Sequence, residues 1–315
     1  MKRKIAVIGA LTNFGRSLLD YLASSGWSAG SVYALDTPKN AKIKIPYGDY
    51  FLPVLGLDSF NFHQVHLCFL CQSALLSADR ESILQSGAYL IDCVGILDGA
   101  PCLIASLNLK GRPKERLITN PTAATIALAH VLAPIHKEFQ IINAEATLLL
   151  SANLFGAPAI QDLLIQSRCL FTRTEPESHF FPKIQAFNLI PDISPALNRK
   201  TADQTKSLLG FPISVSSCLT PVFQGEAYSL TFTTRKKNSL SRIREICADS
   251  CCVDNAFAPD LGLTTQDILL GDSICVSRLS AVPFRPSTYH LWLLCDSLRM
   301  GAIPNAVQVA EYLLG

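Results

Sequence analysis

The stretch of this chain that most resembles a catalytic site in residue types and spacing is the turn Asn120-Pro-Thr-Ala-Ala-Thr125. It follows a short apolar strand and is predicted to open a helix that continues towards Phe139, because Pro121 suits a helix entry. A helix start presents unpaired N–H groups and the positive end of the helix dipole, where a nucleophile or an anionic intermediate would sit. The first turn here carries only threonine and alanine, so the residues at the point of attack are inert.

A second candidate site is the glycine turn Gly9-Ala-Leu-Thr-Asn-Phe-Gly15, between a β-branched run and a helical pattern. Strand, glycine turn and helix together open a dinucleotide-binding βαβ unit. Gly9 can make the tight turn, and Gly15 can let the helix pack close to the strand. Thr12 stands where a middle glycine would admit the pyrophosphate to the backbone. The candidate cofactor contacts in this turn are Gly9, Asn13, Phe14 and Gly15.

Asp36 ends the next predicted strand, 31–36, about twenty residues beyond the glycine turn. An acid at this position commonly meets a ribose hydroxyl in NAD-binding folds. An Asp at a strand end is equally often a turn former or a helix cap, so both interpretations stay open. A carboxylate there would repel a 2′-phosphate, which makes NAD more plausible than NADP if any dinucleotide binds.

Two groups of elements are needed to position these residues. Strands at 4–8, 31–36, 65–71, 88–92 and 116–119 alternate with helices at 16–22 and 78–85, which predicts a Rossmann-like, doubly wound parallel sheet. We assign residues 1–122 to this α/β domain, with a closing helix within 298–315.

Residues 123–297 are predicted to form a second, α+β domain with a largely antiparallel or mixed sheet. Its predicted strands are 141–150, 213–219, 222–224, 228–234, 272–279 and 290–295. Its predicted helices after the one at 122 are 159–166, 201–209 and 240–249, and residues 170–195 are expected to form a long ordered excursion.

Composition limits the classes of partner. The net charge is +2 and 49% of residues are hydrophobic, so nothing favours nucleic acid as a partner. No run reaches the ~18 apolar residues of a membrane span, and the first apolar run is better explained as a strand than as a signal peptide. The eleven cysteines lie singly in apolar segments, which indicates buried thiols, a cytoplasmic protein and no metal site. Cys68 and Cys71 are expected on opposite faces of one strand, and His130 and His136 in the core or an interface.

Several segments resemble the aspartate-semialdehyde dehydrogenase family over nearly the whole chain. They are the opening Ile5-Ala-Val-Ile-Gly-Ala10 with Asn13 and Gly15, the stretch Ala186-Phe-Asn-Leu-Ile-Pro-Asp192, and Leu298-Arg-x-Gly-Ala302 with Asn305-Ala-Val-Gln308. The resemblance implies a cofactor domain and a second domain that forms a homodimer. It also adds Asn305 to the candidate cofactor contacts. It also implies a small-molecule ligand in the cleft between the domains.

In that family the turn carries a cysteine whose thiolate attacks an aldehyde; hydride leaves to NADP, and phosphate releases the acyl group. The cysteine position is Ala123 here, and a methyl group cannot attack. The resemblance places the family's substrate-positioning glutamine at Leu150, its carboxylate-binding arginine at Leu219 and its general-base histidine at Glu226. We therefore expect no catalytic residue of the parental kind at any of these four positions.

The resemblance also implies that a residue that binds phosphate in the family is replaced here. The resemblance places one of its arginines at Asp98, whereas Lys200 matches a phosphate-binding lysine, and Asn120 and Thr122 complete a substrate-like pocket. Two cations are lost, and Glu226 and Asp98 add negative charge. Like charges 4 Å apart repel by about 4 kcal/mol at an effective dielectric of 20, so the parental anionic substrate is expected to bind poorly.

The favoured hypothesis is a catalytically degenerate family homologue, of the sort called Usg proteins, which keeps the fold and dimer for a binding or regulatory role. A second hypothesis is an active acylating NAD(P) oxidoreductase with altered residues, in which Cys71 or Cys93 lies near a strand end and Glu226 acts as base. A third is a partner that associates with a true dehydrogenase and modifies it.

Overall fold

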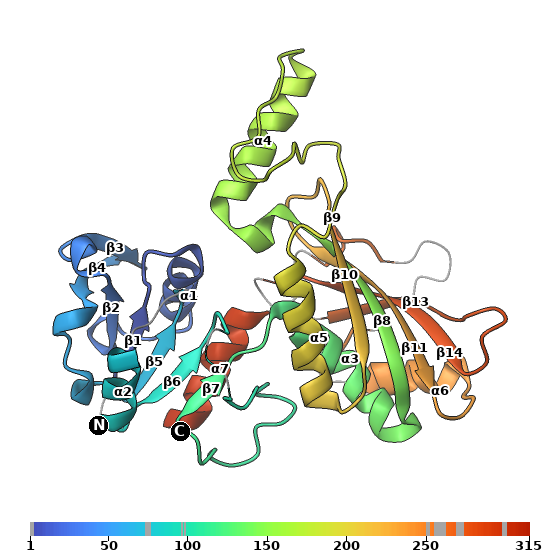
Figure 1. The fold of residues 1–315 in the computed structure, drawn as a ribbon, viewed down its shortest axis with the longest axis horizontal. Helices are drawn as coiled ribbons and strands as arrows, with labels where there is room; N and C mark the ends of the chain where they lie inside the picture. Colours follow the sequence, from blue (N-terminus) through green and yellow to red (C-terminus); the bar gives the residue numbers. More distant parts are fainter. Residues whose placement is uncertain are drawn as a thin grey trace. The chain divides into compact units, whose positions relative to one another are not determined.

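The computed structural model describes residues 3–72, 77–95, 97, 99–249, 253–254, 263–268, 274–297 and 301–315 (Figure 1). The chain forms two compact units, one of Met1–Pro121 with Ala302–Gly315 and one of Thr122–Gly301. Each unit contains a seven-stranded sheet within the described residues. The chain changes units close to the boundaries after residues 122 and 297 that the sequence suggests.

The first unit is built around a mostly parallel sheet in the order β3-β4-β2-β1-β5-β6-β7. Its strands are β1 (Ile5–Ile8), β2 (Val32–Asp36), β3 (Lys44–Tyr47), β4 (Tyr50–Gly56), β5 (Leu67–Leu70), β6 (Tyr89–Asp92) and β7 (Leu117–Thr119). Its helices are α1 (Asn13–Ser24), α2 (Ser77–Gln85) and α7 (Ala302–Leu314). Neighbouring strands are parallel except for the pair β3 and β4, so the predicted Rossmann-like sheet is confirmed.

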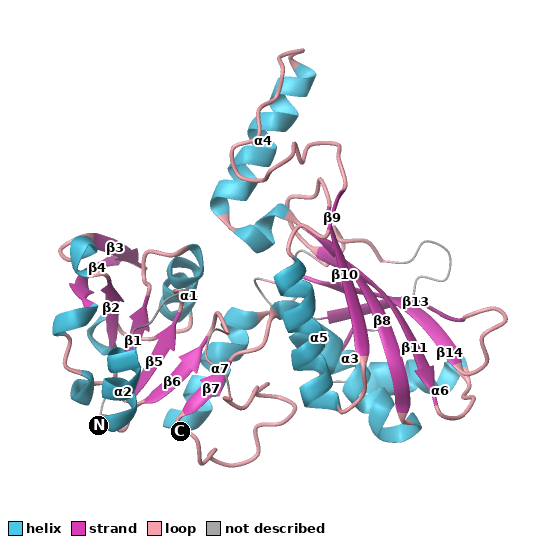
Figure 2. Ribbon diagram, viewed as in Figure 1, coloured by secondary structure: helices cyan, strands magenta, loops and turns pink. Residues whose placement is uncertain are grey.

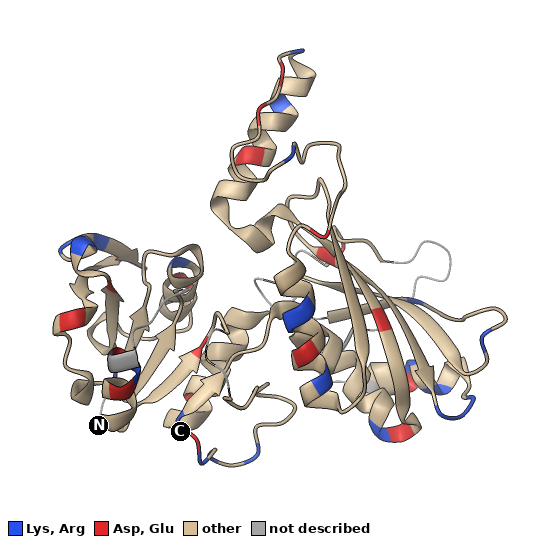
Figure 3. Cartoon of the chain, in the orientation of Figure 1, with Lys and Arg blue, Asp and Glu red and all other residues tan. Residues whose placement is uncertain are grey.

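Both faces of this sheet are buried, which explains its continuous apolar strands. All four residues of β1 are buried; Ile5 and Val7 pack with α1 and α7, whereas Ala6 and Ile8 face the side that carries α2. Cys68 and Cys71 also belong to opposite clusters, which confirms the prediction for this pair. Charged residues lie mainly in the helices and loops of each unit (Figure 3).

The hairpin of β3 and β4 is an element that the sequence did not predict. Pro46 and Pro53 lie within its strands, and proline lowers the expectation of a strand because it donates no ladder hydrogen bond. Pro46 is tolerated because β3 is the edge strand of the sheet. Alternate residues of the hairpin, Ile45, Leu52 and Val54, point into the core of the first unit.

The second unit has a mixed sheet in the order β12-β13-β14-β11-β8-β10-β9 (Figure 2). Its strands are β8 (Ile141–Leu150), β9 (Ile190–Pro191), β10 (Ile213–Leu219), β11 (Glu226–Thr234), β12 (Val253–Asp254), β13 (Ile274–Ala281) and β14 (Thr288–Cys295). Its helices are α3 (Ala123–Phe139), α4 (Ala157–Phe171), α5 (Pro195–Leu209) and α6 (Leu240–Asp249). The pairs β8–β10 and β12–β13 are parallel and the other pairs antiparallel, so the predicted mixed sheet is confirmed.

The predicted strand at 222–224 is wrong. These residues form a turn between β10 and β11, in which the carbonyls of Val222 and Phe223 accept from the amides of Ala152 and Asn153. Gly225, with φ of 86°, ends the turn in a conformation that a strand does not contain. The predicted strand at 272–279 is confirmed from residue 274 onwards, and its first two residues lie outside the described part.

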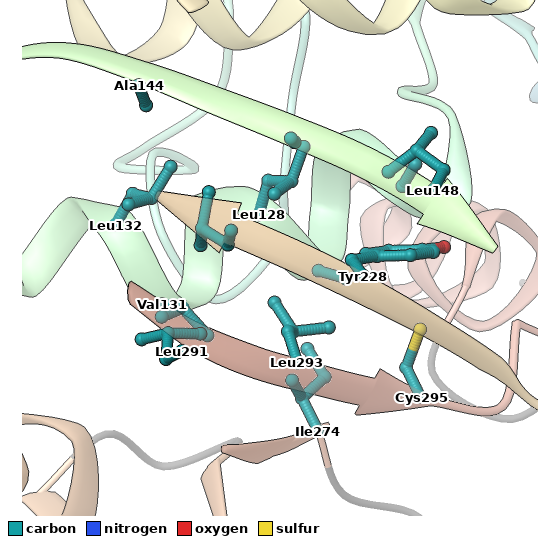
Figure 4. Close-up of a cluster of buried hydrophobic side chains, with 14 of the residues drawn as sticks. Leu128, Val131, Leu132, Ala144, Leu148, Tyr228, Ile274, Leu291, Leu293 and Cys295 are labelled. Atoms are coloured by element: carbon teal, nitrogen blue, oxygen red, sulfur yellow. The ribbon is translucent and has the colours of Figure 1, made fainter. Parts of the chain in front are cut away.

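The core of the second unit lies between one face of its sheet and helix α3. Leu128, Val131 and Leu132 of α3 face the side chains of Leu291 and Leu293 from β14 (Figure 4). The burial of β11 alternates strictly along its length, as a sheet covered on one face requires. A mostly apolar helix such as α3 is stable here because the sheet, α5 and α6 all contact it.

The two histidines of α3 have ordinary structural environments. His130 is 4% exposed, and its Nδ1 lies 2.8 Å from the carbonyl of Ile126. The ring of His136 packs on Phe211 with centroids 4.8 Å apart. Their predicted place in the core is confirmed for His130, and His136 lies at the rim of the same core.

Helix α4 and the segment that follows it form an arm that extends away from the sheet of the second unit (Figure 2). We call residues 157–189 the arm. Its exposed apolar residues are Leu164, Ile165, Leu170, Phe171, Phe180, Phe187 and Leu189. Phe171 and Phe187 contact each other edge to face, with ring centroids 5.9 Å apart. Exposed apolar side chains gathered on one segment favour a protein contact site there.

Two further expectations concern the whole chain. The nine cysteines of the described part are free thiols, and six of them are buried, as the sequence predicts. Among the described residues, the helices are too short or too polar to cross a membrane.

Candidate functional site

The turn at 120–125 begins helix α3 with its polar groups already bonded inside the second unit. Thr122 is the N-cap, and its Oγ1 accepts from the amide of Thr125 at 3.1 Å. Gln204 of α5 reaches the same place: its Oε1 accepts from the amide of Thr122 at 3.0 Å and from the hydroxyl of Thr125 at 3.1 Å. The sequence analysis missed Gln204 because its distance along the chain gives no sign of this contact.

Ala123 is half-buried and lies against the backbone at Gly301. A Cβ atom at residue 301 would be 1.8 Å from the carbonyl oxygen of Ser297 and 3.1 Å from the Cβ of Ala123. Only glycine fits at 301, which explains in physical terms one of the family-like residues near the C-terminus. Gly301, directly before α7, therefore lies beside the position of the expected nucleophile.

The other three altered positions meet at one end of the second sheet. Leu150 is the last residue of β8 and is the register partner of Leu219, the last residue of β10. Strand β11 runs antiparallel to β8 with Ala227 opposite Leu149, so Glu226 lies beside Leu150. Leu150 and Leu219 are both fully buried. Sheet register thus brings together residues that are up to 76 positions apart in sequence.

Glu226 is the ionisable member of this group and is fully buried. Its Oε1 accepts from the hydroxyl of Ser151 at 2.8 Å and from the hydroxyl of Ser297 at 3.1 Å, and its Oε2 accepts from the amide of Ser297 at 3.0 Å. Burial raises the pKa of the Glu226 carboxyl to about 7, although these hydrogen bonds lower it. Neighbouring Asp296 raises the pKa of Glu226 further.

Ser297 connects Glu226 to the helix start. Its amide and hydroxyl bind the carboxylate of Glu226, while its carbonyl lies against Gly301, which in turn contacts Ala123. We call Ala123, Leu150, Leu219 and Glu226, the four positions at which the sequence resemblance expects other residues, the altered cluster. The sequence analysis missed Ser151 and Ser297, because serine is common and neither residue lies in a motif.

The region behind Glu226 is dry core. Tyr228, two residues along β11, is 1% exposed, and its hydroxyl is hydrogen-bonded to the thiol of Cys295. Figure 4 shows the Tyr228 ring and the Cys295 sulfur side by side at this end of the cluster. Burial raises the pKa of both groups, so neither supplies an anion near neutral pH.

The other residues of the predicted substrate-like pocket lie in different parts of the chain. Lys200 is half-buried on α5, next to Thr201, whose hydroxyl lies 3.1 Å from that of Thr122. Asp98 lies outside the described residues. Asn120 belongs to the first unit, where its Nδ2 donates to the carbonyl of Ala302 at 2.8 Å.

The glycine turn of the first unit is tightly packed, and the Thr12 side chain binds one of its backbone amides. Gly9 has φ of 81°, and a Cβ there would be 2.7 Å from the Cβ of Gln72. A Cβ at Gly15 would be 2.2 Å from the carbonyl oxygen of Gly9, so both glycines are required, as predicted. Thr12 Oγ1 accepts from the amide of Gly15 at 3.0 Å and lies 2.8 Å from the oxygen of Gly9. Thr12 therefore already binds one of the helix-start amides that could hold a phosphate.

Asp36 acts in the structure as a turn former. Its Oδ1 accepts from the amide of Thr37 and from Nδ2 of Asn40, both at 2.8 Å, and its Oδ2 accepts from the amide of Leu11 at 3.2 Å. The side chain is buried at 6% exposure and joins the glycine turn to the loop after β2. A contact with ribose stays a prediction, and it would have to share this carboxylate.

The predicted cofactor contacts at Asn305, Phe14 and Asn13 also lie in the first unit. Asn305 donates from Nδ2 to the carbonyl of Leu103 at 2.9 Å and to Oδ1 of Asn120 at 2.8 Å, so both of its N–H donors bind protein. This pair of asparagines fastens α7 to the end of β7. Phe14 packs against the core of the unit, while Asn13 is exposed at the start of α1.

In sequence and in structure, this chain is similar to aspartate-semialdehyde dehydrogenases over nearly its full length. No family model matches the chain. Aspartate-semialdehyde dehydrogenase of Rickettsia conorii is 28% identical over 335 residues, which cover 99% of this chain and 98% of that protein. A solved structure of a probable aspartate-semialdehyde dehydrogenase from Pseudomonas aeruginosa superposes with a TM-score of 0.89 at 26% identity, over 100% and 99% of the two chains. The chain is therefore similar in sequence and in fold, over its full length, to aspartate-semialdehyde dehydrogenases.

The relatives that this chain resembles carry two names. A USG-1 protein homolog of Pseudomonas aeruginosa is 26% identical over 326 residues, which cover 98% of this chain and 97% of that protein. Because the relatives of both names match the whole chain, each is similar to both units and not to the glycine turn alone. The likeness gives the fold of both units.

Proposed function

We propose that this protein is a non-catalytic member of the aspartate-semialdehyde dehydrogenase family that keeps the fold and a homodimer for a binding or regulatory role. The observation that carries the proposal is Ala123 at the start of α3, in the position that the sequence resemblance gives to the nucleophilic cysteine. A methyl group has no electron pair with which to attack an aldehyde. Loss of an essential nucleophile lowers turnover by roughly a millionfold in a well-studied case.

The state of Glu226 gives independent support. A general base needs an accessible lone pair within hydrogen-bond reach of the substrate proton. Glu226 is fully buried and accepts three hydrogen bonds from Ser151 and Ser297. We infer that Glu226 holds β11 to the segment after β14, as a structural group, and does not replace the histidine of the active enzymes.

Substrate binding is weakened by the same cluster. Leu150 and Leu219 offer no hydrogen bond to a carboxylate, and an ionised Glu226 would repel one by about 4 kcal/mol at 4 Å and an effective dielectric of 20. A thiol restored at residue 123 would therefore meet a site that binds the anionic aldehyde poorly. The altered cluster makes the loss of activity a property of the site as a whole.

Dinucleotide binding, if retained in the first unit, is proposed to favour NAD over NADP. The supporting observation is the buried carboxylate of Asp36 beside the glycine turn, which would repel a 2′-phosphate. Thr12 leaves fewer amides for the pyrophosphate, so weak binding is expected. Calorimetric titration with NAD and NADP checks this part, and NADP binding more tightly than NAD would contradict it.

A homodimer formed by the second unit is the proposed assembly. The exposed apolar side chains of the arm, with Phe171 at 79% and Phe187 at 70% exposure, favour a protein contact there. The free thiols of the described part fit the cytoplasmic location that we propose together with it. Association with an active dehydrogenase is a further proposal that co-purification from cells checks.

An altered enzyme that uses Cys71 or Cys93 has weaker support. These thiols are 2% and 7% exposed. Reactive thiolates are at least partly exposed, whereas these two thiols are buried. Thiol labelling of the native protein distinguishes this reading, since rapid modification of either residue would support it.

The assay that tests the proposed function measures phosphate-dependent reduction of NADP by aspartate semialdehyde with the purified protein. We expect no turnover above the uncatalysed rate. Turnover at an ordinary enzymatic rate, about 1 s⁻¹ or faster, would overturn the proposal.

A further inference from the structure

A cavity of about 560 Å³ opens at the end of the second sheet that is opposite to Glu226. It lies between the turn that joins β13 to β14 and the segment from the end of β11 to the start of α6. Strand β11 reaches Thr234 here, beside Ile141 at the start of β8, whereas Glu226 lies beside the end of β8. The volume is within the range of about 300–1,000 Å³ that small-molecule sites occupy.

The charge around this cavity is positive. Lys237 and Arg285 line it, and its lining contains no carboxylate within the described residues. Figure 3 shows Lys and Arg on both segments that carry these residues. Arg285 forms an ion pair with Glu145 at 4.0 Å, between side chains that are 58% and 63% exposed, so this pair is weak. Both cations are therefore able to bind an anion.

The walls of the cavity are held in place before any ligand arrives. The Tyr289 hydroxyl accepts from the amide of Asn238 at 2.6 Å and donates to its carbonyl at 2.7 Å, which ties the two segments together. Pro283 and Pro286 restrict the turn between β13 and β14. A preformed wall lowers the entropy lost on binding.

Phe284 gives the rim an unusual feature. Its side chain is fully exposed, at 104% of the reference area, and its φ of 61° is a conformation that bulky residues rarely adopt. An aromatic face in that position gains by stacking on a planar group. We propose that this cavity binds a nucleoside diphosphate, with its phosphates on Lys237 and Arg285 and its base against Phe284.

Calorimetric titration of the full chain with ADP, adenosine and inorganic phosphate tests this site. We expect ADP to bind most tightly, and its affinity to fall as salt rises because the phosphate contacts lie near the surface. The double variant K237Q/R285Q is expected to weaken ADP at least tenfold, since each lost bond to a charged group typically has that effect. The variant F284A is expected to weaken ADP about fivefold or more.

Two matched variants complete the experiment. Lys183→Gln removes one positive charge from the arm, away from the cavity, and is expected to leave ADP binding unchanged. Glu145→Gln removes the acid that pairs with Arg285 and is expected to leave ADP binding equal or tighter.

Full ADP affinity in K237Q/R285Q would overturn the proposal, because the ligand would then bind elsewhere. Adenosine or phosphate binding as tightly as ADP would overturn it too, since one of the two contacts would contribute nothing. The proposed loss of catalysis is independent of all these outcomes, because it concerns the other end of the sheet.

Discussion

Replacing Glu226 with glutamine should make this protein more stable at neutral pH, and more so as the pH rises. Burial raises the pKa of Glu226 from its ordinary value of 4.5 to about 7. The folded state thus holds the proton more tightly than the unfolded state does. The proton bound to Glu226 therefore stabilises the folded state fully below about pH 4.5, and this stabilisation is lost as the pH rises towards 7.

The size of this effect follows from the two pKa values. Each pKa unit corresponds to about 1.4 kcal/mol, so a rise of about 2.5 units costs about 3 kcal/mol of folding stability once Glu226 is ionised. Solvent does not screen the charge of Glu226, because its side chain is fully buried. Glutamine has nearly the same shape and no charge, and the hydroxyls of Ser151 and Ser297 can turn to accept from its amide.

Urea unfolding of the natural protein and of E226Q at pH 5, 6, 7 and 8 measures the difference. We expect the advantage of E226Q to grow by about 2.5 kcal/mol between pH 5 and 8, with most of the increase below pH 7. The control is Glu145→Gln, which removes an exposed carboxylate of the same unit and should give a nearly constant difference. An E226Q advantage that stays flat across this range would refute the reasoning about burial.

Three other changes have defined outcomes. Thr122→Ala removes the cap of α3 and should lower the free energy of unfolding by about 1 kcal/mol in urea titrations, whereas an unchanged value would show that Gln204 alone suffices. Gly301→Ala places a Cβ 1.8 Å from the oxygen of Ser297 and should lower the melting temperature by several degrees or more; an unchanged melting temperature would contradict the close approach. The double change F171S/F187S on the arm should shift sedimentation from dimer to monomer without loss of circular dichroism, and a dimer that persists would remove the arm from the interface.

The parts of this fold that the sequence predicts well are those in which burial dictates residue type locally. Residues 5–8 are apolar at every position because both faces of the first sheet are covered, and a continuous apolar run shows this without any partner. Gly9 and Gly15 could also be predicted from the sequence. A Cβ atom at Gly15 would collide with Gly9, and one at Gly9 would collide with Gln72 at the end of the neighbouring strand.

The parts that the sequence did not predict depend on register or on distant contacts. The turn at 222–224 has a strand-like composition, yet its carbonyls bond to the backbone after β8, and only the folded sheet supplies that partner. Gln204 and Ser297 reach the candidate site from 82 and 71 positions away from their partners, and neither lies in a motif. The altered positions were found through the family resemblance, whereas their meeting at one sheet end follows from the pairing of Leu150 with Leu219.

The most direct test of the central claim compares the natural protein with its Ala123→Cys variant in the phosphate-dependent reduction of NADP by aspartate semialdehyde. The variant returns the thiol to the helix start and leaves Leu150, Leu219 and buried Glu226 in place. We predict no turnover above the uncatalysed rate for either protein, because the altered cluster offers neither a substrate clamp nor an accessible base. Turnover of about 1 s⁻¹ or faster by the natural protein would contradict the account, and the same rate in Ala123→Cys alone would show that the cluster had lost only its nucleophile.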